Sequence, residues 1–401
     1  MTQAGARSPR LGILIDRLVL GGVEKTAIEE VRALRELGVD ATLLVLKRDR
    51  SIPAAVQEWI SGLPVVYLDD RIPRWLRLSW KIPGFSFFSL FHLLYPAVIP
   101  LRVARKEWDA VVSHNSYTTL TAWSLSRFRA IPYSMFVWDP IASVLVNAYP
   151  SGLVAAIRPL VLPAGRWVDR MLARGARQLI AGSRTYVQYL SSFLRAGASI
   201  VVAPPGCVPA KTARAAAGRY LYTATSWKEG KQLEVLLKAL TKLPEAELVI
   251  GGRWLHPSYH EQMAALVQEL GLGSRVKITG ELSENDMARY AAGALCSVTT
   301  NAERGFGMPA LEAAAQGCTF VCPRIAGVGA YFTDGVEAFY YEEGNSDQLA
   351  AVLRPLIKDH DLALRAGVAA WERARSTLTW RHHAITIANA VGQPVPAQLT
   401  V

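Results

Sequence analysis

Short apolar segments alternate with longer amphipathic segments along almost the whole chain. Apolar segments of strand length occupy, in the first half, Leu11–Ile15, Thr42–Leu46, Val65–Leu68, Ala110–Ser113, Tyr133–Val137, Gln178–Ala181 and Ile200–Ala203. Helical patterns of roughly 10–15 residues follow these segments. Such an alternation is typical of parallel sheets covered by helices on both faces, and it predicts an α/β protein.

The alternation begins again after Pro204–Pro205–Gly206. Strand-like segments then occupy Tyr220–Ala224, Glu247–Ile250, Val276–Thr279, Leu295–Thr299, Thr319–Cys322 and Ala338–Tyr341. A chain of 401 residues is long enough for two domains. We therefore predict two doubly wound Rossmann-like domains facing a cleft, at residues 1–205 and 206–378, followed by a final helix and tail at 379–401.

The formal net charge of +11 favours anionic partners such as phosphorylated donors or anionic lipids. The basic residues form no RNA- or DNA-binding motif, so a nucleic-acid partner is disfavoured. Neither a CxxC pair nor the spacing of a metal site occurs among the cysteines, which are Cys207, Cys296, Cys318 and Cys322. They are interpreted as reduced core thiols, which together with an N-terminus unlike a signal peptide predicts a cytoplasmic protein.

The segment NAERGFGMPALEAAAQG, residues 301–317, is the most informative. It follows a predicted strand, crosses a loop containing Gly305 and Gly307, and enters a helix at Pro309, a residue suited to the first helical turn. Amide groups at a helix start bind anions, and glycines let a phosphate approach closely. One turn on, Glu312 could accept hydrogen bonds from both hydroxyls of a ribose. The alternative is a structural turn, with Glu312 favouring the helix dipole.

Two lysines follow the first strand of the second half, in the segment ATSWKEGKQLEVLLKAL. Lys228 and Lys231 are predicted at the carboxyl edge of the same parallel sheet as the glycine loop, where ligands of open α/β sheets bind. They are candidate clamps for a diphosphate. The alternative is that both are ordinary solvated surface lysines.

A Gly-Gly pair follows the first strand of the chain and precedes an amphipathic helix. Gly21 and Gly22 permit close approach of the backbone to a ligand. The segment lacks the GxGxxG fingerprint of dinucleotide-binding proteins, which weakens that interpretation. A tight turn without a ligand is the alternative.

Taken together, these motifs resemble the retaining GT-B glycosyltransferases of family 4, often called group 1 transferases. The resemblance rests on LVLGGVEKTAIEEVRALRELGV, on Lys231, on GFGMPALEAAAQG, on Ser183, on the Pro204–Pro205–Gly206 turn, and on Thr379–Trp380. It spans nearly the whole chain, and the glutamate motif is its most specific part. The resemblance implies that the last helix returns to the first domain.

The resemblance also implies roles for individual residues. Glu312 would bind the donor ribose, Lys231 the diphosphate, and Gly22 would face the diphosphate from the other domain. The backbone of the segment Phe306, Gly307 and Met308 would lie near the donor phosphates and sugar. The implied reaction is the metal-independent transfer of a hexose, with mannose slightly preferred, from a nucleotide-diphosphate sugar such as GDP-mannose or a UDP-sugar.

Three departures from the family pattern stand out. Where the family has a glutamate eight positions before Glu312, this chain has Arg304, with Glu303 one position earlier; either residue could take the catalytic role beside Lys231. The family arginine before the lysine is replaced by Ser226, and Lys228 could compensate. On the acceptor side, Trp138 stands before Asp139 where the family often has histidine. His114 matches another histidine that some members carry there, and is structural in the alternative interpretation.

Cations and aromatic residues are mixed between residues 71 and 106, from Arg71 and Trp75 to Phe91 and Tyr95. A second such region, Val144–Leu162, leads into arginines at 166, 170, 174 and 177. The mixture suits an anionic membrane surface, and predicts peripheral contact at the inner face of the cell membrane with a glycan or lipid-linked acceptor. Buried helices with solvated arginines are the alternative.

Two competing functions follow from the same residues. The replacements Arg304 and Ser226 would also suit a catalytically inactive module that binds nucleotide sugars. Another GT-B enzyme, such as a nucleotide-sugar epimerase, is the second alternative.

Overall fold

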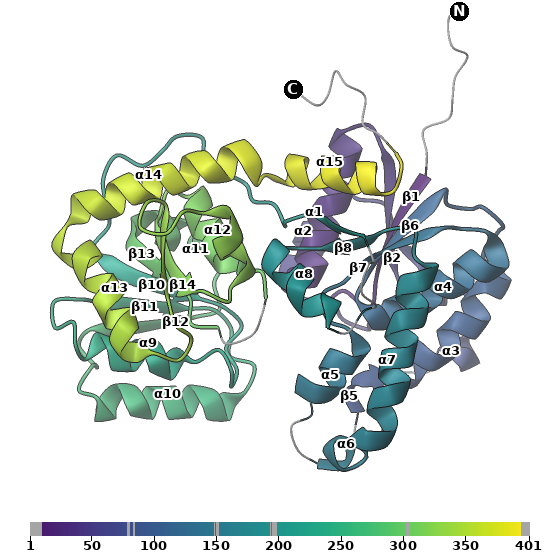
Figure 1. Cartoon of the computed structure of the whole chain (residues 1–401), viewed down its shortest axis with the longest axis horizontal. Helices are drawn as coiled ribbons and strands as arrows, with labels where there is room; N and C mark the ends of the chain where they lie inside the picture. Colours follow the sequence, from purple (N-terminus) through teal and green to yellow (C-terminus); the bar gives the residue numbers. More distant parts are fainter. Residues whose placement is uncertain are drawn as a thin grey trace, which may run out of the picture. The chain divides into compact units, whose positions relative to one another are not determined.

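The computed structural model describes residues 10–77, 81–82, 85–147, 149, 152–192, 194, 199–301 and 305–393. The chain divides into two compact units (Figure 1). The first unit comprises Met1–Pro204 and Trp380–Val401, and the second comprises Pro205–Thr379.

A parallel sheet of seven strands forms the centre of the first unit, in the order β3-β2-β1-β6-β7-β8-β9. Its strands are β1 (Arg10–Ile15), β2 (Asp40–Val45), β3 (Val65–Tyr67), β6 (Ala110–His114), β7 (Tyr133–Phe136), β8 (Leu179–Ala181) and β9 (Ile200–Val202). Nearly continuous apolar strands such as β1 are expected when both faces of a sheet are covered.

The helices of the first unit are α1 (Gly22–Glu36), α2 (Ala54–Trp59), α3 (Leu90–Val98), α4 (Ser116–Arg129), α5 (Ile141–Asn147), α6 (Gly152–Ala156), α7 (Arg158–Gly175), α8 (Arg184–Ser191) and α15 (Trp380–Ala390). Short 3-10 turns lie at η1 (Leu68–Arg71), η2 (Arg74–Leu76) and η3 (Ile99–Arg102). α1 buries Ala27, Ile28, Val31 and Leu34, a spacing that places one apolar face on the sheet.

A parallel sheet of six strands forms the centre of the second unit, in the order β12-β11-β10-β13-β14-β15. Its strands are β10 (Tyr220–Ala224), β11 (Leu248–Gly251), β12 (Val276–Gly280), β13 (Ala294–Val298), β14 (Phe320–Pro323) and β15 (Ala338–Tyr341). The covering elements are α9 (Leu233–Leu240), α10 (Pro257–Glu269), α11 (Glu284–Gly293), α12 (Met308–Ala315), η4 (Gly327–Tyr331), α13 (Ser346–Lys358) and α14 (His360–Thr377).

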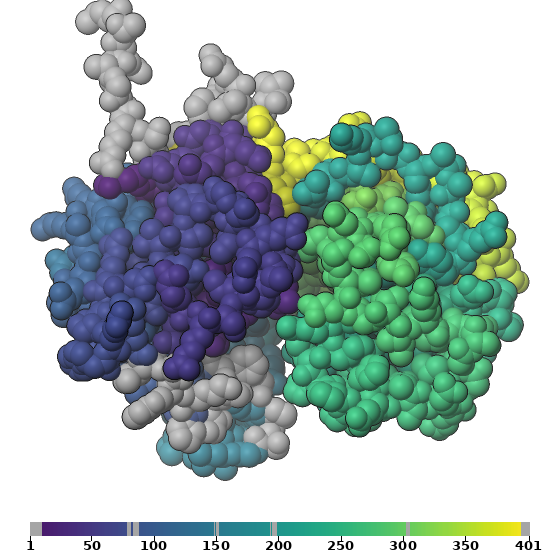
Figure 2. Space-filling model, turned by 180° about the vertical axis from the view of Figure 1, so that it is seen from behind, coloured from purple at the N-terminus to yellow at the C-terminus, as the bar shows by residue number. Residues whose placement is uncertain are grey.

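The predicted α/β architecture is confirmed, with each of the predicted strands within two residues of an observed one. The final helix α15 packs against α1, so the chain ends in the unit where it began; Figure 2 shows its yellow atoms against the purple atoms of the first elements. The ends of the second unit are joined by a hydrogen bond from the Cys207 amide to the Leu378 carbonyl (2.8 Å).

Residues 81–106 differ from the sequence-based expectation. A short antiparallel pair, β4 (Lys81–Ile82) and β5 (Phe85–Ser89), precedes α3. Phe91 and Tyr95 of α3 are completely buried in the core, so the expectation that they face a membrane is corrected. Among the described helices, none combines the length and the apolar character needed to cross a membrane. All four cysteines are free and buried, as predicted.

Candidate functional site

The carboxyl edge of the second sheet carries the predicted donor residues. β10 and β13 are neighbours in the middle of that sheet, and the strand order reverses between them. Ligands of open α/β sheets bind outside the carboxyl ends of the strands at such a reversal. The segment with Lys228 and Lys231 follows β10, and the segment with the glycines and Glu312 follows β13.

The lysine loop is held by a buried tryptophan in its middle. The Trp227 indole donates to the Gly251 carbonyl (2.7 Å), and the Trp227 amide donates to the Arg253 carbonyl (2.7 Å). Gly252 lies beneath the loop with φ +104°, and a Cβ there would lie 2.0 Å from the Thr225 carbonyl oxygen. Only glycine fits this position, so the backbones after β10 and β11 are locked together.

A side chain after β13 joins the two predicted motifs. The hydroxyl of Thr300, itself buried, donates to the backbone carbonyl of Lys231 at 2.6 Å. The Lys231 amide in turn donates to the Lys228 carbonyl (3.1 Å) and closes a turn around Gly230, which has φ +89°. The lysine loop and the strand that leads into the glycine loop therefore form one hydrogen-bonded structure.

Backbone hydrogen bonds from η4 hold the glycine loop in place. The Gly327 amide donates to the Gly305 carbonyl (3.0 Å), and the Val328 amide donates to the Phe306 carbonyl (2.6 Å). Gly307 caps α12 with φ +94°, where a Cβ would lie 3.1 Å from Cγ1 of Val328. The helix therefore begins at Met308 on a rigid loop, with the positive end of its dipole at the loop.

Glu312 lies one turn into α12, half-buried. Burial first, and then the charge of Glu312, raise the pKa of Tyr222 on β10 and that of Cys207. The Tyr222 hydroxyl is buried without a hydrogen-bond partner among the described residues. A half-buried carboxylate near an edge that carries cations is suited to hold neutral hydroxyl groups of a ligand.

Sequence reasoning missed two residues of this edge. Thr300 has no motif of its own, and Arg253 follows the pair Gly251–Gly252 at the end of β11. Arg253 is a further cation of the same edge, and its Nε is buried without a partner among the described residues. The predicted catalytic residues Glu303 and Arg304 lie outside the residues that the structure describes.

In the first unit, the Gly-Gly loop leads into α1. Gly21 is the N-cap residue, and a Cβ there would lie 2.2 Å from a carboxylate oxygen of Glu24. The Glu24 side chain is therefore folded over the loop. Burial raises the pKa of Glu24 to about 7, against the lowering effect of its own backbone amide. Near neutral pH this carboxyl can both donate and accept a proton.

A buried histidine contacts the carboxylate that follows β1. The Ser89 amide donates to Nδ1 of His92 (3.1 Å), which leaves Nε2 as the nitrogen that donates to Asp16 (3.0 Å). Both side chains are buried. The capping interaction of α3 thus fixes the tautomer of His92 and the orientation of Asp16.

His114, predicted on the acceptor side, is completely buried at the end of β6. Its Nδ1 accepts from the Trp138 indole (3.1 Å), and its Nε2 lies 3.3 Å from the Glu30 carboxylate. The same carboxylate oxygen lies 3.0 Å from Nε2 of His383 on α15. In this structure His114 supports Trp138 from within, which is the structural interpretation of this histidine.

Trp138 and Asp139 follow β7 at the carboxyl edge of the first sheet. The Trp138 ring stacks on Phe136, with 4.6 Å between centroids, and is half-buried. Asp139 is exposed and accepts from the Tyr186 hydroxyl at 3.3 Å, while that hydroxyl also donates to the Trp138 carbonyl. The predicted pair therefore lies at the carboxyl edge of the first sheet.

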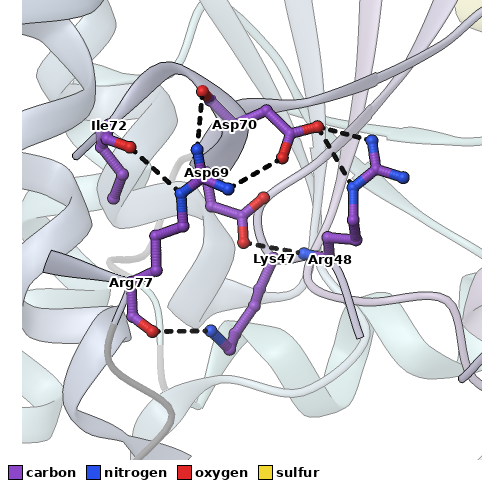
Figure 3. A network of polar contacts seen from close by, with 6 residues as sticks. All are labelled: Lys47, Arg48, Asp69, Asp70, Ile72 and Arg77. Carbon is purple, nitrogen blue, oxygen red and sulfur yellow. Dashed lines mark hydrogen bonds and ion pairs between the residues drawn. The ribbon is translucent and has the colours of Figure 1, made fainter. Parts of the chain in front are cut away.

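A charged network closes the carboxyl ends of β2 and β3 (Figure 3). The Arg48 guanidinium contacts the Asp70 carboxylate, which also accepts from Arg77 (3.2 Å). The Arg48 amide donates to Asp69 (3.0 Å), and Lys47 donates to the Arg77 carbonyl (3.4 Å). Burial lowers the pKa of Lys47 and raises that of Asp69. Three cations thus share two carboxylates here.

No group of three or more His, Cys, Asp and Glu side chains that could hold a metal ion occurs within the described ranges.

Known proteins resemble the chain in both sequence and structure. A D-inositol 3-phosphate glycosyltransferase of Mycobacterium ulcerans is 30% identical over 160 residues, 38% of this chain and 34% of that protein. The chain thus spans about a third of that relative. A D-inositol 3-phosphate glycosyltransferase of Catenulispora acidiphila is 24% identical over 371 residues, 86% of this chain and 85% of that protein.

Two solved structures illustrate the shared fold. HepE of Anabaena, solved in complex with UDP and glucose, has a TM-score of 0.74 at 18% identity, covering 95% of this chain and 99% of that one. Sucrose-phosphate synthase of Thermosynechococcus elongatus has a TM-score of 0.74 at 17% identity, covering 96% and 98%. Residues 21–206 match the glycosyl transferase 4-like domain, and residues 210–373 match the glycosyl transferases group 1 family. The chain therefore belongs to the group 1 glycosyltransferases and has their GT-B fold.

Proposed function

We propose that this glycosyltransferase moves a hexose, with retention of the anomeric configuration, from a nucleotide-diphosphate sugar to a glycan or lipid-linked acceptor at the inner face of the cell membrane. The observation that carries the proposal is the hydrogen bond from Thr300 to the Lys231 carbonyl, because it joins the lysine loop to the strand that leads into the glycine loop. Both loops then act on one ligand at the edge of one sheet.

The donor is held by complementary charges and hydroxyl contacts in this proposal. The start of α12 and the lysines at 228 and 231 bind the diphosphate, and Glu312 binds the ribose. Arg253 supplies the second strong phosphate contact that Ser226 cannot make. As the bond between sugar and phosphate breaks, the same cations and amides stabilise the charge that develops on the departing nucleotide diphosphate. No metal ion is required for this electrostatic role.

Two classes of nucleotide base are candidates for the donor. A guanine nucleotide with mannose is favoured by the frequency of such donors in the family. A uracil nucleotide is favoured by the Anabaena structures, which were solved with UDP and with UDP-glucose. Neither class is excluded by the charges at the sheet edge, since both donors present the same diphosphate.

The test is calorimetric titration with GDP-mannose, UDP-glucose, UDP-N-acetylglucosamine and the free nucleotides. We expect one nucleotide class to bind, and Glu312→Ala to weaken it about 10- to 100-fold through the loss of charge-assisted hydrogen bonds. Arg253→Ala should weaken the binding of the nucleotide diphosphate and leave the binding of the nucleoside unchanged. Glu261→Ala, an exposed glutamate of α10, is the matched control. Binding indifferent to Glu312 would contradict the proposed ribose contact.

Turnover separates an enzyme from an inactive binding module. We expect release of the nucleotide diphosphate from the preferred donor, at a rate unchanged by EDTA, and a product anomer identical to that of the donor by NMR. Tight donor binding without release or transfer in the presence of lipid and glycan acceptors would favour the inactive module.

A further inference from the structure

The outer face of α7 in the first unit carries two adjacent stripes of side chains. At 3.6 residues per turn, residues four apart on a helix lie on the same face. One stripe consists of Arg166, Arg170 and Arg174, and the other contains the apolar residues Leu160, Trp167 and Met171. Leu160 is 78% exposed and Trp167 is 65% exposed, so with Met171 they form an exposed apolar stripe beside the arginines.

The opposite face of α7 fixes the helix in the unit. The buried Asp169 accepts from the amides of Ile141 and Ala142 at the start of α5 (2.8 and 2.9 Å). Gly165 lies against the same helix, where a Cβ would come 2.9 Å from a methyl carbon of Leu145. The helix therefore cannot turn its exposed apolar stripe inward. Figure 1 shows α7 beside α5 and α6 along the lower part of the first unit.

The arginine stripe has no compensating charge. The only acidic residue of α7 is the buried Asp169, and none of the three arginines pairs with a carboxylate among the residues described. Arg170 and Arg174 line a hollow of about 370 Å³ together with Trp167 and Met171. Cations beside exposed aromatic and aliphatic groups match the headgroups and upper acyl chains of an anionic bilayer.

Within the region at 71–106, favoured by the sequence for membrane contact, the part around Trp75 offers a weaker match. Arg71 pairs with Glu107 (2.7 Å), and Arg77 pairs with Asp70 (3.2 Å), so these cations are already neutralised. The aromatic rings of Phe91 and Tyr95 lie in the core. Trp75 is 75% exposed but has only Arg74 as an exposed cation beside it within η2.

We infer that the outer face of α7 docks on a bilayer surface containing anionic lipid. The arginine stripe contacts the anionic headgroups, and Leu160, Trp167 and Met171 enter the interface beside it. The inference rests on the proposed function and extends it. A first unit bound to the bilayer would lie at the surface that holds a lipid-linked acceptor. The inference concerns the surface and not the transfer step, so the two can fail separately.

The test is sedimentation of the full chain with vesicles of phosphatidylcholine alone, and of phosphatidylcholine with one third phosphatidylglycerol. We expect binding to the anionic vesicles that weakens with added salt, and little binding to the neutral ones. Each arginine near the surface accounts for about a fivefold change in partitioning. Arg170→Glu with Arg174→Glu should therefore reduce binding by on the order of 25-fold or more, and Trp167→Ser with Leu160→Ser should reduce it comparably.

The matched control is Trp75→Ser with Arg74→Glu, which removes an equally exposed tryptophan and arginine from the region at 71–106. We expect no change in binding from this control. The inference is overturned if the control abolishes vesicle binding while the α7 variants retain it, or if the unaltered chain does not distinguish anionic from neutral vesicles. It is also overturned if analytical ultracentrifugation shows a dimer that the α7 variants dissociate without changing vesicle binding, since a second copy would then cover the face. Release of nucleotide from the donor, followed in all variants, reports separately on the proposed function.

Discussion

Replacing Glu30 by glutamine tests the buried charges that hold the last helix. Glu30 of α1 is completely buried beside His114 and His383, and the His383 Nδ1 also contacts the Pro204 carbonyl at 2.8 Å. Both ring nitrogens of His383 thus face oxygen atoms, one of them an oxygen of the Glu30 carboxylate. Glutamine keeps the shape of the side chain and removes its charge.

The expected magnitude follows from the pKa of the carboxyl. Burial alone would raise this pKa, but the charges and hydrogen bonds of His114 and His383 outweigh burial and lower the pKa from 4.5 to about 2. Such a difference corresponds to about 3 kcal/mol of folding free energy. Because the folded-state pKa is the lower one, the stabilisation is complete above pH 4.5 and is lost as the pH falls toward 2.

Differential scanning calorimetry measures the effect on the unfolding transition of the first unit. For a unit of this size, a loss of about 3 kcal/mol lowers the Tm by about 6–12 °C. We expect that decrease for Glu30→Gln at pH 7, an equal decrease at pH 6, and a shrinking one below pH 4.5. A decrease of less than about 2 °C at pH 7 would refute the argument that the charge stabilises this helix.

Glu24→Gln is the matched control on the same helix, with the opposite expected sign. The pKa of Glu24 is raised to about 7, so ionisation opposes folding. The loss of folding free energy caused by this ionisation is absent below pH 4.5 and grows until the pH passes 7. The variant should therefore match the unaltered chain in mild acid and exceed its stability by about 1–3 kcal/mol above neutral pH. A loss of stability at pH 8 would contradict the sign of this effect.

Two further predictions concern the edge of the second sheet. Gly307→Ala places a side chain at φ +94° against Val328, and should destabilise the second unit by about 1–2 kcal/mol in calorimetry. The control Gly305→Ala should leave the stability unchanged, because the nearest atom to a Cβ there is 3.9 Å away. Equal effects of the two variants would contradict the conformational argument. Thr300→Val removes the hydrogen bond to the Lys231 carbonyl, and should raise the donor KM by up to about tenfold in steady-state kinetics with a smaller change in kcat; an unaltered KM would show that the lysine loop holds its position without it.

The sequence was sufficient to predict the two sheets, because buried parallel strands are short, apolar and separated by amphipathic helices. Local signals such as Ser283 at the start of α11 also belong to this pattern, and the Ser283 side chain accepts from the Asp286 amide. The order of the strands was not predictable, since the strands carry similar apolar residues and nothing local distinguishes their neighbours. The cap of α13 is Asn345, and the neighbouring Ser346 is also a residue type suited to capping, so side-chain chemistry alone does not decide where this helix begins.

The candidate site was predictable where glycines mark it. Gly307 and its helix are local features, so a loop and a cap could be inferred from spacing. Long-range contacts were not visible in the same way. Three distant segments contribute the partners Glu30, His114 and His383. Only the folded structure shows that His114 is buried between them. Phe91 and Tyr95 were misjudged for the same reason, because aromatic residues beside arginines occur both in cores and at membranes.

In each unit, a hydrogen bond joins the two places where the chain passes to the other unit. In the second unit it links Cys207 and Leu378, and in the first it links Pro204 and His383. The second unit is therefore inserted between two segments of the first unit that contact each other. An insertion whose ends meet can be exchanged, excised or expressed alone without opening the host. If the proposed division holds, with the nucleotide bound mainly at the second unit and the acceptor at the first, a chimera with the second unit of another group 1 transferase should change the donor while keeping the acceptor.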